Sequence, residues 1–236
     1  SSEYVDAGLI DITSSKTLSI WFKSSNISSN QGLFEIMPDP NTSDFLIVWI
    51  YNSKILVSSN GVASDSKESS VLSSNTWYNL IITKSSGIID NIYINGLNDT
   101  QSTTDTLGFV GGRGNTYIGA TYQGTAYANE FNGEINHLSV FNYTLSQNQI
   151  NYLYNSGNPQ SPMAISGQPP FAYYPLGGSS TGNASTLTIP NESVPSATVF
   201  DVSGTDYIKV NNSPSIEPAK NLTVSVWVNW KTGSNT

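Results

Sequence analysis

Residues 77–96 read WYNLIITKSSGIIDNIYING, and this stretch decides the fold. The apolar segments Leu80-Ile81-Ile82 and Ile92-Tyr93-Ile94 are rich in β-branched and aromatic residues, which favour strands. Asn95-Gly96 closes the second segment, and this pair tolerates a positive φ at both central turn positions. The stretch therefore predicts β-strands and a tight hairpin turn.

Strand and turn patterns continue on both sides of this stretch. Residues 17–23 (TLSIWFK) alternate with a period of two, which places one set of side chains on each face of a sheet. Residues 45–51 form a nearly continuous apolar run, which predicts a strand covered on both faces. Asn-Gly pairs recur at 60–61 and 132–133. Many short strands with regular turns predict an all-β fold, an antiparallel sandwich.

One short helix interrupts the strands. Ser146-Gln147-Asn148-Gln149 has the Ser-x-x-Gln form of a capping box, which satisfies backbone N–H groups at a helix start. Ile150 and Leu153 are spaced to share one face, and Gly157 stands where a helix would stop. We expect a helix of about two or three turns near residues 146–155.

The end of the chain repeats its beginning. Residues 17–23 return as 223–229 (TVSVWVN), and each copy follows a Tyr-hydrophobic pair, Tyr4-Val5 or Tyr207-Ile208. Such a repeat predicts a tandem array of modules, of which these 236 residues are a window.

Residues 158–170 separate the two copies. This segment contains several prolines, which block regular ladders, and it predicts a linker. Residues 171–176 (FAYYPL) then look like a new first strand. We therefore divide the chain into a first domain at 1–157, a Pro-rich linker at 158–170, and the N-terminal part of a second domain at 171–236.

Composition excludes several functions. The net charge is −8 and Arg113 is the single arginine, so no basic surface can neutralise phosphates and we expect no nucleic-acid partner. The absence of cysteine removes disulfides, thiolate catalysis and the common structural zinc sites. No apolar run approaches the roughly 20 residues that a membrane helix needs, so we expect no membrane insertion in this segment.

The order of motifs resembles a known family. The motifs that carry the resemblance are residues 77–82, residues 92–96, Tyr117-Ile118-Gly119, residues 131–135 (FNGEI), Phe141-Asn142 and Leu145-Ser146 at the helix start. This order is similar to that of laminin G-like domains, which are members of the concanavalin A-like lectin and glucanase superfamily. The resemblance implies an antiparallel jelly-roll β-sandwich over most of residues 1–157, and the opening third of a second one at 171–236.

The resemblance also implies a gap in the first domain. The second copy has residues 171–176 and 197–201 ahead of Tyr207, whereas nothing equivalent stands ahead of Tyr4. The first domain would thus lack its first strand or strands. Either these strands precede the window, or another chain donates them, which would cover an exposed sheet edge and link subunits into a fibre.

Catalytic motifs of the superfamily are absent from the sequence. Its retaining glucanases carry Glu-x-Asp-x-x-Glu on one strand, because the two carboxylates must lie about 5 Å apart. Here Glu130 and Glu134 flank the Asn132-Gly133 turn, which predicts two solvated carboxylates. His137 is the only histidine and lies in a strand with one solvated face, which predicts a surface or structural role. We therefore expect no enzyme.

Calcium is the one ion that the resemblance suggests, and we expect no required cofactor. Jelly-roll domains of this kind often hold one Ca²⁺ at the rim through Asp or Asn oxygens and carbonyls. Many members of the family resemble Gly-x-Ile-Asp at this strand, and this chain has Asn136 in place of the Asp. The change from Asp to Asn removes a negative charge. The alternative is a set of scattered loop acids. Several acids lie in loop-like segments, Asp99 among them. The candidate ligands are Asp39, Asp44, Asp90 and Asp105.

Sugar binding requires an exposed aromatic face with amide or carboxylate partners. Tyr122, Tyr127 and Asn129 have this composition in a segment between two strands, and they are our predicted glycan site. The alternative is a generic surface loop, because tyrosine is common in strands. The family pattern also predicts that three tryptophans pack in the core, namely Trp21, Trp77 and Trp227.

Glycosylation is a further expectation. Eight asparagines begin Asn-x-Ser/Thr, although a sequence this rich in Asn, Ser and Thr produces several such sites by chance. The candidate sites are Asn26, Asn41, Asn98, Asn142, Asn183, Asn191, Asn211 and Asn221.

Taken together, the sequence predicts a non-enzymatic extracellular repeat protein with a structural or adhesive role. It would be a surface-layer, appendage or fibre component at a cell or virion surface, and its partners would be copies of itself or other surface proteins. The alternative is a lectin-type module that binds carbohydrate.

Overall fold

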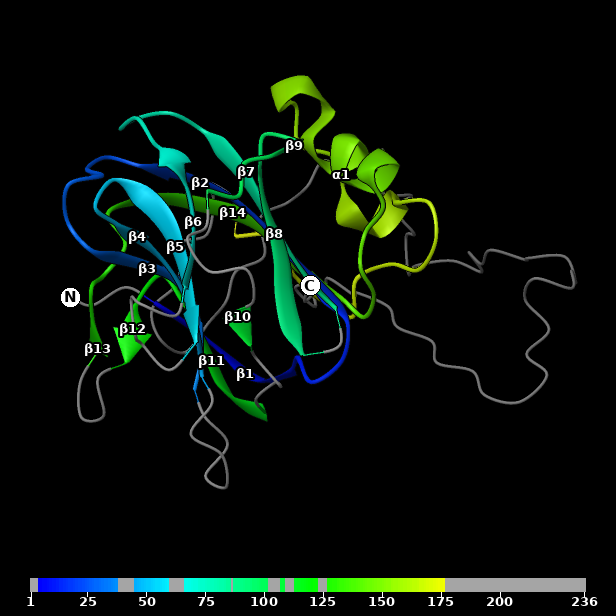
Figure 1. The fold of residues 1–236 in the computed structure, drawn as a ribbon, viewed down its shortest axis with the longest axis horizontal. Helices are drawn as coiled ribbons and strands as arrows, with labels where there is room; N and C mark the ends of the chain where they lie inside the picture. Colours follow the sequence, from blue (N-terminus) through cyan, green and yellow to red (C-terminus); the bar gives the residue numbers. More distant parts are fainter. Residues whose placement is uncertain are drawn as a thin grey trace, which may run out of the picture. The chain divides into compact units, whose positions relative to one another are not determined.

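The computed structural model describes residues 4–37, 45–59, 66–85, 87–101, 107–108, 113–122 and 127–176, all of which belong to one unit of the chain, Ser1–Glu192. They form two antiparallel sheets that share one apolar core, a small two-stranded sheet and one short α-helix (Figure 1). The predicted all-β class and antiparallel sandwich are confirmed, and so is the single short helix.

The first sheet has six strands. In spatial order they are β1 (Val5–Asp11), β11 (Arg113–Ile118), β3 (Gln31–Ile36), β4 (Leu46–Tyr51), β5 (Lys54–Ser59) and β6 (Ser66–Val71). The turn between β4 and β5 consists of Asn52 and Ser53, both with positive φ, 48° and 63°. Positive φ at both positions matches the twist of the flanking strands.

The second sheet has seven strands. In spatial order they are β10 (Leu107–Gly108), β8 (Ile88–Ile94), β7 (Tyr78–Ser85), β2 (Lys16–Ser24), β14 (Gly133–Phe141) and β15 (Ala172–Tyr174), with β9 (Leu97–Asn98) paired to β8 off this path. Asn95 and Gly96 form the predicted tight turn between β8 and β9, with φ of 52° and 80°.

The core between the two sheets explains the alternation of residues 17–23. Leu18, Ile20 and Phe22 all point into it and are almost fully buried. Burial of each such side chain stabilises the fold by about 1.5–3 kcal/mol relative to exposure. The intervening side chains of β2 are also buried, because a second layer covers the other face of this sheet.

That second layer contains α1 (Gln147–Tyr154). The capping box is confirmed, since the Ser146 N–H donates to Gln149 Oε1 at 2.9 Å. The helix ends at a left-handed Asn155 (φ 39°), before the predicted Gly157 stop, and a 3₁₀ turn η1 (Asn155–Gly157) follows. The second apolar cluster, between the helix and the sheet, contains Ile81, Phe141, Leu145, Ile150, Leu153 and Ile165.

A buried hydroxyl in this region gives a stability test. Thr83 on β7 is 1% exposed, and its Oγ1 has no hydrogen-bond partner. We expect Thr83→Val to raise the free energy of unfolding by about 1 kcal/mol, because it removes an unsatisfied polar atom with little change of shape. Denaturant unfolding measures this change.

Thr17 provides the matched control, because it pairs directly with Thr83 on the neighbouring strand. Its hydroxyl donates to Tyr143 O at 2.9 Å and accepts from the Leu145 N–H at 3.0 Å. Thr17→Val should therefore lower the free energy of unfolding by about 1–3 kcal/mol. Equal effects of the two substitutions would contradict this account.

Residues 171–176 do not stand apart from the first domain. The predicted first strand of a second domain contains β15, which pairs with β14 and ends the seven-stranded sheet. The predicted linker, residues 158–170, connects the region of α1 to β15 in the seven-stranded sheet. It contains a 3₁₀ turn, η2 (Pro162–Ala164). Residues 177–236 of the predicted second domain lie outside the described residues.

Candidate functional site

The predicted glycan residues lie together on a small hairpin. Its strands are β12 (Thr121–Tyr122) and β13 (Tyr127–Ala128), and their register places Tyr122 opposite Tyr127. Asn129 follows β13, and its Nδ2 donates to Thr121 Oγ1 at 2.9 Å. The structure therefore brings the positions of Tyr122, Tyr127 and Asn129 together, and the local amide–hydroxyl bond fixes the end of the hairpin.

This hairpin rests on the outer face of the six-stranded sheet, the face that points away from the core between the sheets. The Gly32 N–H on β3 donates to Asn129 O at 2.7 Å. A Cβ on Gly32 would lie 2.7 Å from the Ala120 carbonyl carbon and 2.7 Å from Thr121 Cγ2. Only glycine leaves room for the hairpin to approach β3 this closely.

A buried carboxyl group holds the hairpin from below. Glu35, also on β3, is 1% exposed, and its Oε2 accepts the backbone N–H of Tyr122. Burial raises the pKa of Glu35 from 4.5 to about 7, against the smaller lowering effect of the Tyr122 hydrogen bond. Glu35 thus positions Tyr122 and titrates near neutral pH.

Aromatic rings continue from the hairpin across the sheet. The Tyr117 ring on β11 lies 5.9 Å from the Tyr122 ring and 6.1 Å from the Tyr4 ring, measured between centroids. Tyr117 is buried in the middle of the row, whereas Tyr4 is exposed and Tyr122 is half-buried. The row leaves its two ends accessible to a ligand.

A second aromatic group lies on β4. Trp49 and Tyr51 are neighbours on the outer face, with ring centroids 5.1 Å apart and a tilt of 31° between the rings. Both side chains are half-buried, so the strand is not covered on both faces as the apolar run predicted. The core side of β4 is fully buried and the outer side is open at these two rings. We call this pair the Trp49–Tyr51 platform.

Charged groups border the platform. Tyr51 pairs in register with Lys54 on β5, and Trp49 pairs with Leu56, which pairs with Glu68 on β6. Lys54 Nζ and Glu68 Oε2 are 2.8 Å apart, and the two side chains are 31% and 28% exposed. A half-exposed cation and anion beside two aromatic rings can donate and accept hydrogen bonds to a polar ligand stacked on those rings. Composition and spacing in the sequence did not single out these four residues.

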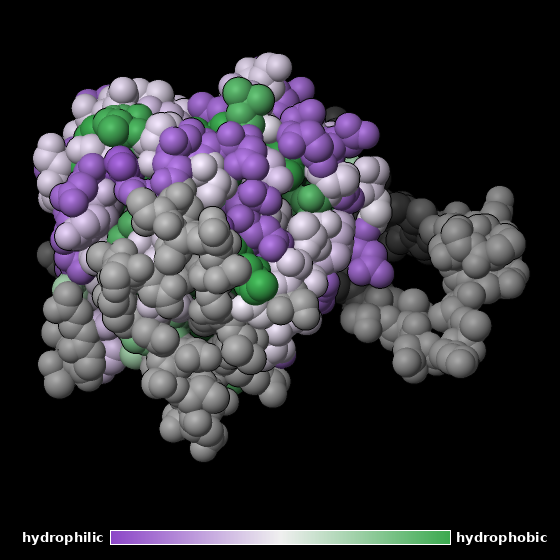
Figure 2. All heavy atoms as spheres, in the orientation of Figure 1, coloured by the Kyte–Doolittle hydropathy of each residue, from purple (hydrophilic) through white to green (hydrophobic). Residues whose placement is uncertain are grey.

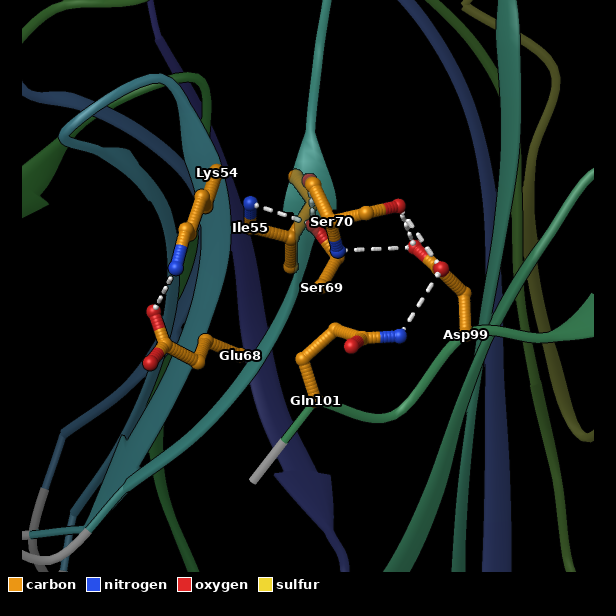
Figure 3. Close-up of polar contacts among 7 residues, drawn as sticks. All are labelled: Lys54, Ile55, Glu68, Ser69, Ser70, Asp99 and Gln101. Atoms are coloured by element: carbon orange, nitrogen blue, oxygen red, sulfur yellow. Dashed lines mark hydrogen bonds and ion pairs between the residues drawn. The ribbon is translucent and has the colours of Figure 1, made fainter. Parts of the chain in front are cut away.

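A separate polar network near this ion pair joins β6 to the segment that follows β9 in the other sheet (Figure 3). The Ser69 hydroxyl accepts the Ile55 N–H at 2.9 Å where the β5–β6 ladder is irregular. The Ser70 N–H and hydroxyl both donate to the Asp99 carboxylate, at 2.9 Å and 2.7 Å. Gln101 also donates to Asp99, so this carboxylate connects β6 to the segment after β9 and its oxygens are already engaged.

The described residues contain no assembled site for the calcium ion that the resemblance suggested. Asp90 lies within strand β8, not in a loop, at a register shift where its neighbours Ile89 and Asn91 pair with β7. Its Oδ1 accepts a hydrogen bond from Ser85 Oγ at 2.7 Å. In the described parts of the chain, no three His, Asp or Glu side chains come together as a metal site. The remaining candidates, Asp39, Asp44 and Asp105, lie outside those parts.

The carboxylates considered for catalysis have surface roles. Glu130 is exposed, and Glu134 forms an ion pair with Lys23 across the β2–β14 ladder. His137 Nδ1 is hydrogen-bonded to the Tyr173 hydroxyl at 2.7 Å. These positions agree with the solvated carboxylates and structural histidine predicted from the sequence.

The tryptophan prediction is correct at one position and wrong at another. Trp21 is buried under α1, stacked on Tyr154 at 6.0 Å. Trp77 is 37% exposed, because it precedes the first residue of β7 and lies beyond the covered part of the sheet. Lys23 Nζ lies 5.3 Å from its ring centroid. Trp227 lies outside the described residues.

Three of the predicted glycosylation sites lie among the residues that the structure describes. Asn26, Asn98 and Asn142 are all exposed. Asn98 is already hydrogen-bonded, since its Oδ1 accepts from Thr100 Oγ1 at 2.8 Å. The other five, which lie outside the described residues, are Asn41, Asn183, Asn191, Asn211 and Asn221.

The surface is mainly polar. Figure 2 shows hydrophilic side chains over much of the coloured surface, with separate apolar patches between them. Among the described helices, none has the length and apolar character required to cross a bilayer.

Comparison with known proteins identifies relatives of this fold. A family model described as the concanavalin A-like lectin/glucanases superfamily matches residues 1–151. No curated protein sequence matches the chain. A heptameric SAP-like pentraxin from Limulus polyphemus is 16% identical, with a TM-score of 0.50, over 72% of this chain and 86% of the pentraxin.

Two further solved structures are similar. A Bacteroides ovatus protein, provisionally named as carbohydrate-binding, is 20% identical with a TM-score of 0.51, and the match covers 78% of this chain but only 50% of that protein. The CBM40 domain of a Ruminococcus gnavus IT-sialidase, solved with α2,3-sialyllactose, is 14% identical with a TM-score of 0.47, over 64% of this chain and 96% of that domain.

Proposed function

Because the chain belongs to the concanavalin A-like lectin/glucanases superfamily, we propose that it is a carbohydrate-binding module without a catalytic centre. The proposed ligand is a glycan bound on the outer face of the six-stranded sheet. The observation that carries the proposal is the Trp49–Tyr51 platform beside the Lys54–Glu68 ion pair.

The chemistry of the platform suits a sugar. A pyranose ring has apolar C–H faces and hydroxyl groups at its edge, so it can stack on an aromatic ring and hydrogen-bond to groups beside it. Lys54 donates and Glu68 accepts, and both already point to the same region of the sheet. Hydrogen bonds to charged groups contribute about 1.5–3 kcal/mol each, which adds specificity to the stacking.

The hairpin extends the same surface. Tyr122 and Asn129, predicted from the sequence, stand above β3, and β3 lies between β11 and β4 in the sheet. We assign them to a secondary subsite on the outer face, next to the Tyr117 row. The Bacteroides ovatus protein of similar fold, provisionally named as carbohydrate-binding, is compatible with this class of ligand.

A glycan array measures the proposed function directly. We expect the chain to bind a subset of glycans, and Tyr51→Ala to weaken that binding at least tenfold, about 1.4 kcal/mol, because half of the stacking surface is lost. Tyr122→Ala should have a smaller effect if its subsite is secondary. Circular dichroism should show that both variants retain the β-sheet signal.

Trp77→Ala is the matched control, because Trp77 is an exposed aromatic residue next to the other sheet. This variant should bind glycans as the native chain does. An array without bound glycans would contradict the proposed function. Binding that is unaffected by Tyr51→Ala and by Tyr122→Ala would place the site elsewhere on the molecule.

A structural or adhesive role is the second candidate. It rests on the sequence repeat and on one feature of the fold, the pairing of β15 with β14 at the edge of the seven-stranded sheet. Both roles fit a module at a cell or virion surface, where a rigid sandwich presents loops and sheet faces to a neighbour.

A further inference from the structure

The edge of β14 receives a strand that is distant in sequence. β15 pairs with it so that Ala172 opposes Val140, Tyr173 opposes Ser139 and Tyr174 opposes Leu138. Residues 142–171, which include helix α1, separate the two strands along the chain. Without β15, β14 would present a row of unpaired backbone groups, which is the surface that recruits a further strand.

Hydrogen bonds extend this pairing at both ends. The Phe171 N–H donates to Val140 O at 2.9 Å, and the His137 N–H donates to Pro175 O at 2.8 Å. His137 occupies a bulge, with φ 47° and a register shift between Asn136 and Ser139 on the β2 side. Pro175 accepts one bond and has no N–H to donate, so the ladder ends there. The edge of β14 is thus shaped to receive a short strand that ends in proline.

Side chains recognise the strand on both of its faces. On the outer side, the rings of Tyr173 and His137 stack with centroids 6.0 Å apart and 10° between planes, and the two side chains are hydrogen-bonded. On the inner side, Ala172, Tyr174 and Leu176 pack against the core. The Tyr174 hydroxyl donates to Ala7 O on β1 at 3.0 Å, so β15 also contacts the six-stranded sheet.

The attachment of β15 within its own chain is nevertheless limited. The strand has three residues, and all of them are only partly buried. Residues 158–170 carry the strand and contain four prolines and a glycine. Ile165 is buried in the apolar cluster under α1, so the tether between this anchor and the strand is the exposed stretch of residues 166–169. A short strand on such a tether can leave its site without unfolding the sandwich, which is the condition for strand exchange between copies.

The sequence places the same segment in a second context. Residues 171–176 precede the repeated pair Tyr207-Ile208 and the repeated strand 223–229. By that repeat they would be the first strand of a following module, yet here they close the sheet of the preceding one. A segment with this position in the repeat is suited to connect one sandwich to another.

We propose that β14 is a strand-acceptor edge, and that residues 171–176 of one copy of this chain dock on β14 of a second copy. The partner is another molecule of the same chain, and the contacts are those of β15. The exchanged strand makes the same contacts, so exchange loses only the effective concentration at which the tether holds β15 beside its own β14. This concentration is of the order of millimolar. A high local concentration of copies therefore favours exchange and links the sandwiches. This inference is independent of the glycan surface.

The absence of native cysteine permits a direct test. Val140 and Ala172 are opposite each other in the register, at a separation that a disulfide can span. Two full-length chains of different mass, one with Val140→Cys and the other with Ala172→Cys, are mixed over a range of concentrations and oxidised. We expect a disulfide-linked heterodimer on non-reducing gels, in an amount that rises with concentration.

Two controls make the result decisive. Asn26→Cys, at an exposed position away from this edge, replaces Ala172→Cys in the mixture and should give at most a tenth of the heterodimer. The double variant Val140→Cys/Ala172→Cys in one chain should form an internal disulfide in dilute solution, which verifies the β14–β15 register. Ser139→Cys with Tyr173→Cys provides a second opposed pair if the first does not fold.

The opposite pattern overturns the proposal. An internal disulfide in the double variant, with no heterodimer above the Asn26→Cys control at any concentration, would show that β15 stays on its own chain. Absence of the internal disulfide in both opposed pairs would show that β14 does not accept this strand at all.

Discussion

Replacement of Gly32 by alanine should lower the free energy of unfolding by about 1–3 kcal/mol and weaken glycan binding by about as much as Tyr122→Ala does. The added methyl group would lie 2.7 Å from the backbone of Ala120 and 2.7 Å from Thr121, so the hairpin must move off β3. That movement breaks the Gly32–Asn129 hydrogen bond and displaces Tyr122. Denaturant unfolding and a glycan array measure the two effects.

Gly8→Ala is the matched control for this substitution. Gly8 lies in β1 with φ 69°, and a Cβ there would meet no atom within 4 Å. The backbone conformation makes alanine unfavourable by about 1–2 kcal/mol, without steric contact with the hairpin. Gly8→Ala should therefore lose some stability and keep glycan binding. Native stability and binding in the Gly32→Ala variant would show that the hairpin does not rest on β3 as described.

Local sequence patterns predicted most of the fold, because they act over a few residues. The period of two in residues 17–23, the Asn95-Gly96 turn and the capping box at Ser146 each satisfy a local geometric requirement, and the structure contains all three. The position of residues 171–176 could not be predicted in this way. Their partner, β14, lies far away in sequence, and strand pairing across such a separation depends on which edge is open.

The candidate site was harder to predict than the fold. Tyr122, Tyr127 and Asn129 are close in sequence, so one hairpin suffices to bring them together. The Trp49–Tyr51 platform is different, because both rings lie in an apolar run that resembles a buried strand. Their exposure depends on what covers the outer face, and so does the burial of Glu35; both are properties of the assembled sheet.

Glu35→Gln should make the protein more stable above neutral pH. The pKa of Glu35 is raised from 4.5 to about 7 by burial, so between these pH values the folded state holds a proton that the unfolded chain has lost. The free energy of unfolding therefore falls as pH rises through this window. At about 1.4 kcal/mol per pKa unit, the full effect above pH 7 is about 3 kcal/mol.

Glutamine removes this titration and keeps the hydrogen bond, because its amide oxygen can still accept the Tyr122 N–H. We expect the variant to exceed the native chain in unfolding free energy by up to about 3 kcal/mol at pH 8, and to equal it at pH 4. Glu130→Gln, which removes an exposed carboxylate, is the control for the change of net charge. Parallel profiles for the native chain and Glu35→Gln would show that the pKa of Glu35 is the same in the folded and the unfolded chain, and would contradict this account.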